Sequence, residues 1–265
     1  MKKNIMIISM MGLIWIWMFS IAYAIPTLQI GAPAGPGDTG IYADYQANLT
    51  NPPEQDTAVT SGSTILAAGV YGNNTLLLGG QYTSSSGNGL NWSDFGFNNV
   101  FNSAGAVLMA TAPQSAGTLT VNGQSPIYST GGFENGFVMP NPPANHDPVK
   151  DTSPDKMYMF FDIGNFAKIA GAVPNFADET GAGDGEIKSL NLNVTGLNWI
   201  HFDVFALETD LRGQTTLVTN LDGNPGSHDV TRKGENPPIP EPSTIMLLGS
   251  GILGLAIYGR KRFKK

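Results

Sequence analysis

Apolar and polar residues alternate along two segments in the second half of the chain, and this pattern constrains the fold more than any other feature. In residues 199–207 every second side chain is apolar, and His201 and Asp203 fall on the opposite face. A shorter alternation covers residues 190–195. We predict neighbouring antiparallel strands here, because a sheet with one buried face shows this period of two. The predicted core residues are Leu192, Ile200, Phe202 and Val204.

Turn-forming residues extend this prediction to the rest of the chain. The 265 residues include 33 glycines and 18 prolines, which helices tolerate poorly and short strands joined by turns tolerate well. We therefore expect an all-β fold, an antiparallel β-sandwich of the jelly-roll type. The chain has no cysteine, which excludes disulfides, thiol nucleophiles and Cys-ligated zinc.

The spacing of apolar runs predicts two strand pairs, and an Asn-Gly dipeptide predicts a tight turn. The pairs join residues 64–70 to 75–82 and 106–111 to 118–121, and the turn is Asn122-Gly123. Further predictions are a first strand at 26–30, a buried strand at 157–163, a helical turn at 166–170, and an exposed loop or boundary at 140–154.

The last 26 or so residues combine a Pro-Glu-Pro motif, an apolar run and a basic end. The apolar run, residues 245–258, is about 14 residues long and so shorter than the roughly 20 that cross a membrane comfortably. Cations beside an apolar segment stay on the cytoplasmic side, so we expect this tail to enter the membrane from outside. The cations are Arg260, Lys261, Arg262, Lys264 and Lys265.

This arrangement resembles the PEP-CTERM sorting signal, with Pro240, Glu241, Pro242 and Ser243 at the motif positions. The resemblance implies recognition by an exosortase-type transpeptidase after export. The alternative is a plain C-terminal membrane anchor, which also leaves the protein on the cell envelope.

The N-terminus has the features of a signal peptide. Lys2 and Lys3 precede an apolar stretch, and Ala22 and Ala24 give the small-x-small pattern that signal peptidase accepts. Cleavage after Ala24 would make Ile25 the new terminus, whereas the alternative is an uncleaved anchor. The predicted parts are a signal peptide (1–24), a β-sandwich ectodomain (25–236), a Pro-rich spacer with the motif (237–243), a hydrophobic sorting helix (244–259) and a basic cytoplasmic tail (260–265).

The segment between the two signals is strongly acidic. Residues 25–239 hold 7 of the 14 lysines and arginines but 20 of the 21 acidic residues, which gives a net charge of −13. Such a surface disfavours nucleic acid and tolerates cations or basic partners.

Four short segments in this region resemble the choice-of-anchor N family, whose members share an ectodomain but end in different anchors. The segments are residues 25–29, 161–166, 201–203 and 227–229. The family has no defined activity, so the resemblance implies no catalytic residues.

Carboxylates suggest where a metal ion could bind. Asp178, Glu179, Asp184 and Glu186 lie in a glycine-rich stretch, and carboxylate oxygens on a flexible loop suit calcium. The alternative is a solvated acidic turn. His201 and Asp203 share one strand face, which suits either a metal pair or, as we favour, a surface or inter-sheet polar pair. Asp222, Asn224 and Asp229 form a weaker set of oxygen ligands.

No catalytic motif accompanies these residues. The region between the signals has neither a Gly-x-Ser-x-Gly elbow nor a His-Glu-x-x-His motif. Aromatic side chains in an Asn/Gly-rich stretch offer either sugar stacking or ordinary burial; they are Trp92, Phe95, Phe97 and Phe101.

We therefore expect a non-enzymatic, exported surface or matrix protein with a structural, adhesive or exopolysaccharide-associated role. Its expected partners are signal peptidase, exosortase, the envelope membrane and exopolysaccharide. The alternative is a secreted carbohydrate-active hydrolase, which would need two carboxylates about 5–10 Å apart in a cleft.

Overall fold

The computed structural model describes residues 24–131 and 156–234, apart from residues 48, 51, 55, 84–88, 98 and 214. The predicted signal peptide up to residue 23, the predicted loop at 140–154, and the sorting motif, hydrophobic helix and basic tail lie outside the described residues. Within the described part, no helix has the length and apolar character to cross a membrane.

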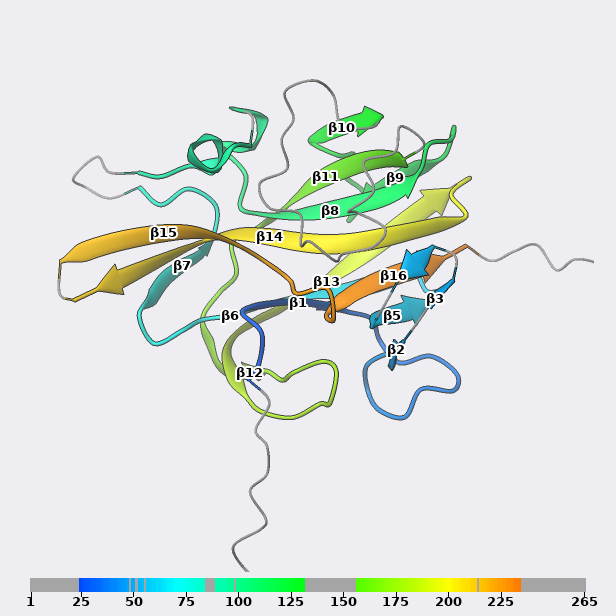
Figure 1. Ribbon diagram of the computed structural model, residues 1–265, viewed down its shortest axis with the longest axis horizontal. Helices are drawn as coiled ribbons and strands as arrows, with labels where there is room; N and C mark the ends of the chain where they lie inside the picture. The colour runs from blue at the N-terminus through cyan, green and yellow to red at the C-terminus, as the bar shows by residue number, and fades with distance from the viewer. Residues whose placement is uncertain are drawn as a thin grey trace, which may run out of the picture.

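The described chain is almost entirely β, as predicted, and its strands form two large sheets and a separate two-stranded hairpin (Figure 1). All strand pairs are antiparallel except β5 with β16. The five-stranded sheet has the order β1 (Leu28–Gly31), β6 (Thr64–Val70), β13 (Gly183–Thr195) and β12 (Ile169–Val173), with β9 (Thr118–Val121) also on β13.

The nine-stranded sheet is organised around one long strand, β14 (Trp199–Arg212). The first part of β14 pairs with β8 and β16, and its second part pairs with β7 and β15. The other strands are β10 (Tyr128–Gly131), β11 (Lys156–Gly164), β8 (Ala106–Pro113), β16 (Asp229–Lys233), β5 (Thr57–Thr60), β2 (Tyr45–Gln46), β15 (Thr216–Gly223) and β7 (Thr75–Gly79).

The main core lies between the two sheets, as expected for a sandwich. Ile200, Phe202 and Val204 on β14 are fully buried, and Leu192 on β13 is 7% exposed. The predicted core residues are therefore confirmed. The strand at residues 157–163 is also confirmed as β11, and Asn122 and Gly123 form a tight turn with positive φ angles of 51° and 77°.

The predicted strand partners, in contrast, are wrong. β13 and β14 belong to different sheets, as do β6 and β7, and also β8 and β9. Only residues 196–198 separate β13 from β14, and three extended residues span about 10 Å, which is about the distance between packed sheets. A short connection can therefore cross the sandwich as easily as it can close a hairpin.

The predicted helical turn at residues 166–170 is also wrong. The Phe166 backbone N–H donates to the Leu78 carbonyl at 2.9 Å, and β12 begins at Ile169. Gly164, with φ of 71°, ends β11 and redirects the chain. Pairing with β7 and β13 replaces the local hydrogen bonds that a helical turn would need.

A second core covers the outer face of the nine-stranded sheet. Two short 3₁₀ helices, η2 (Trp92–Phe95) and η3 (Asn99–Phe101), place aromatic rings against β8, β11 and β14. Trp92 and Phe101 are fully buried, and Phe97 is 2% exposed. These rings therefore fill a core and offer no open platform for a sugar.

Candidate metal centre

His201 and Asp203 lie on the outer face of β14, opposite the residues that point into the main core. They are not surface residues, because His201 is fully buried and Asp203 is 3% exposed. The alternation in the sequence correctly placed them on the second face of the strand. It gave no information on whether that face is covered.

A small hairpin brings a third group to this face. Its strands, β3 (Leu49–Thr50) and β4 (Pro53–Glu54), pair only with each other among the described strands (β3 is labelled in Figure 1). Glu54 is 3% exposed, and its Oε2 lies 3.6 Å from His201 Nδ1. The hairpin thus inserts a carboxylate into the interior.

Strand β16 supplies the fourth group, Asp229, which is fully buried. His201 Nε2 lies 3.4 Å from Asp203 Oδ2 and 4.0 Å from Asp229 Oδ2. If Glu54, His201 and Asp229 each contribute one ligand atom, these three atoms lie within 4.8 Å of one another. No other described group of three or more His, Asp or Glu residues meets this distance.

Neighbouring polar side chains hold the cluster in place. Thr231 is the cross-strand neighbour of His201, and its Oγ1 lies 3.1 Å from Nδ1. Thr57 Oγ1 donates to Thr231 Oγ1 at 3.3 Å. On the other side, Asn224 Nδ2 donates to Asp203 Oδ1 at 3.3 Å, and its own Oδ1 accepts from the Val204 backbone at 2.7 Å. Such second contacts fix an imidazole in one orientation.

The charge of this interior cluster requires compensation. Buried carboxylates cost free energy unless protons, cations or hydrogen bonds offset their charge. The pKa of Tyr45 on β2 responds to this environment. Burial has the largest effect and the negative charge of Asp229 the next largest, and together they raise this pKa well above its usual value. Tyr45 therefore stays neutral and donates its hydroxyl to the Ile30 carbonyl.

The four residues predicted to bind calcium divide into two places. Asp178 and Glu179 line a hollow of about 210 Å³ together with Asp44. Asp184 and Glu186 instead lie on β13, where they accept the backbone N–H groups of Gly171 and Ala167. Calcium binding by this segment stays a prediction. Of the weaker set, Asp222 accepts the backbone N–H of Gly223, whereas Asn224 and Asp229 belong to the buried cluster.

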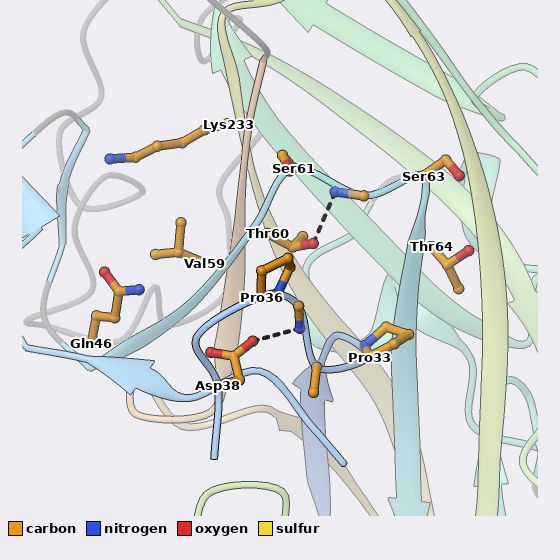
Figure 2. A pocket seen from close by; sticks show the side chains of 13 residues that line it. Pro33, Pro36, Asp38, Gln46, Val59, Thr60, Ser61, Ser63, Thr64 and Lys233 are labelled. Carbon is orange, nitrogen blue, oxygen red and sulfur yellow. Dashed lines mark hydrogen bonds between the residues drawn. The ribbon is translucent and has the colours of Figure 1, made fainter. Parts of the chain in front are cut away.

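A hollow of about 600 Å³ lies between the 33–38 loop and the end of β5 (Figure 2). Asp38 is the only carboxylate among its described lining residues, and it accepts the backbone N–H groups of Gly35 and Asp44. This geometry does not provide the two carboxylates of a glycoside hydrolase. The other lining side chains with polar groups are Gln46, Thr60, Ser61, Ser63, Thr64 and Lys233.

Comparison with known proteins identifies the C-terminal segment. Residues 238–262 match the PEP-CTERM protein-sorting motif. No curated protein and no solved structure matches the chain. The matched segment covers the Pro-Glu-Pro residues and the apolar run, in agreement with the resemblance in the sequence. The chain is therefore an exported protein that carries an exosortase sorting signal and is handled at the cell envelope and surface.

Proposed function

We propose that the ectodomain is a non-enzymatic structural or adhesive module that associates with exopolysaccharide at the cell surface or in the extracellular matrix. The observation that carries this proposal is the sorting motif at residues 238–262, which follows the β-sandwich in the chain. This proposal includes three expectations from the sequence. They are signal-peptide cleavage after Ala24, the five-part division of the chain and the resemblance to the choice-of-anchor N family.

Two features of the ectodomain support the matrix role over the alternative hydrolase. The His201 cluster is buried, so a polymer has no access to its carboxylates. The hollow in Figure 2 is lined by apolar side chains such as Pro33, Pro36 and Val59 and by hydroxyl and amide groups, and the latter can form hydrogen bonds with sugars. Adhesion through such a surface needs no reacting group.

Fractionation of cells that export the protein tests this role. We expect the wild-type protein in the matrix fraction, and we expect enzymes that degrade the polysaccharide to release it. The triple variant Pro240→Ala, Glu241→Ala, Pro242→Ala removes the motif and should remain in the membrane fraction. Wild-type protein that stays in place after the polysaccharide is degraded would contradict the association.

The proposal also includes calcium binding by the segment that contains Asp178, Glu179, Asp184 and Glu186. The hollow shared by Asp44, Asp178 and Glu179 supports it for Asp178 and Glu179 alone, because three carboxylates line one small space there. Calcium should then raise the midpoint of thermal unfolding relative to EGTA, and Asp178→Asn should reduce this difference. Equal midpoints in calcium and EGTA would indicate a solvated acidic turn.

A further inference from the structure

We propose that Glu54, His201 and Asp229 bind a divalent transition-metal ion such as zinc in the interior of the ectodomain, with Asp203 beside them. These residues come from β4, β14 and β16, three strands that are far apart in the sequence. The ion would join the β3–β4 hairpin to the nine-stranded sheet. Its role is structural.

The donor set selects the class of ion. One imidazole nitrogen with carboxylate oxygens is typical of zinc and other first-row transition metals. Calcium and magnesium prefer sites made of oxygen atoms alone. The central position of His201 therefore favours a transition metal over calcium, which we assign to a different segment of the chain.

The spacing of the side chains can be compared with the spacing of ligand atoms around an ion. Glu54 Oε2 lies 3.6 Å from His201 Nδ1, whereas the Asp203 and Asp229 oxygens lie 3.4 and 4.0 Å from Nε2, and one ion binds only one of these two nitrogens. Ligand atoms around a tetrahedral zinc ion, each about 2.0–2.2 Å from the metal, lie about 3.3–3.6 Å from one another. The ligand atoms of Glu54, His201 and Asp229 lie within 4.8 Å of one another, so these side chains would move closer together to hold one ion.

Charge gives a third argument. With ionised carboxylates and a neutral imidazole, the four side chains carry three negative charges inside the protein. A divalent cation would reduce this to one net negative charge. Asp203 can carry that charge while its Oδ1 accepts a hydrogen bond from Asn224 Nδ2. Metal binding would lower the repulsion among these carboxylates.

Burial indicates what the ion would do. None of the four residues is more than 3% exposed, and closed sites of this kind are structural, whereas catalytic zinc keeps a position open for water or substrate. The β3–β4 hairpin has only two residues in each strand and pairs with no other described strand. A metal ligand at Glu54 would fix this hairpin to β14 and β16 and couple its position to folding.

The experiment uses the exported protein, purified in mild detergent. Elemental analysis should find about one equivalent of zinc per chain. After removal of metal with a chelator, zinc at about 100 times its Kd should raise the midpoint of thermal unfolding by about 5–10 °C. Glu54→Gln and Asp229→Asn keep the side-chain shape but remove a charged ligand, so both should lose the bound zinc and the shift.

His228→Gln is the matched control. Its ring lies outside the cluster and contacts Ser227 and Asn175, so this variant should keep both the zinc and the shift. Less than about a tenth of an equivalent of zinc in the wild-type protein, with no response to added zinc, would overturn the proposal in favour of a cluster balanced by protons. Retention of zinc by both Glu54→Gln and Asp229→Asn would also overturn it. The zinc content of the wild-type protein decides the question even if a variant does not fold.

Discussion

Replacing Phe202 with alanine is expected to lower the free energy of unfolding by about 3–5 kcal/mol. Phe202 is fully buried between the two sheets, on the strand that pairs with four others. The substitution removes most of an aromatic side chain and leaves a cavity that rigid neighbouring strands cannot close. Urea denaturation of the exported protein, monitored by tryptophan fluorescence, measures the change.

Leu76→Ala is the matched control, because Leu76 lies on β7 of the same sheet and is 46% exposed. Its cost should stay below about 1 kcal/mol, as is usual for exposed positions. A loss below about 1 kcal/mol for Phe202→Ala would show that this face of β14 is not the core of the sandwich.

Replacing Trp92 with alanine is expected to cost a similar amount, about 3–5 kcal/mol. The Trp92 ring packs edge-on against Phe97 at 5.1 Å and against Phe101 at 6.4 Å. Its Nε1 donates to the Ala104 carbonyl at 3.4 Å. The second core therefore loses both packing and a hydrogen bond, which the same denaturation experiment can measure.

This variant also distinguishes a core residue from a sugar-binding residue. Leu90→Ala is a suitable control near η2, because Leu90 is 37% exposed. Trp92→Ala protein that is as stable as the wild type, but no longer associates with the matrix, would indicate an exposed stacking platform. Loss of stability in Trp92→Ala, with little change in Leu90→Ala, is the result expected from the structure.

The sequence predicted the faces of strands better than their partners. Alternation places Phe202 in the core because successive side chains point to opposite sides of any strand. Only β15 is a local partner of β14, which it follows after residues 213–215. The other partners, β7, β8 and β16, come from distant segments that nothing local in the β14 sequence identifies. Short connections such as residues 196–198 are equally compatible with a hairpin and with a crossing between sheets.

Only part of the candidate metal centre could be predicted from the sequence, because the rest depends on contacts between distant segments. His201 and Asp203 share a strand face, so their proximity follows from their spacing of two. Glu54 lies in a two-residue strand with no regular pattern, and only the folded chain brings it to His201. The four predicted calcium ligands are close in the sequence, but β13 directs Asp184 and Glu186 to backbone partners of their own.

Mass spectrometry of the mature protein, isolated from the envelope and matrix of the producing cells, tests the central claim most directly. An exported and exosortase-processed protein should begin at Ile25 and yield no peptide from residues 245–265. Recovery of the intact chain with its basic tail, Arg260 to Lys265, would contradict sorting and indicate a plain membrane anchor.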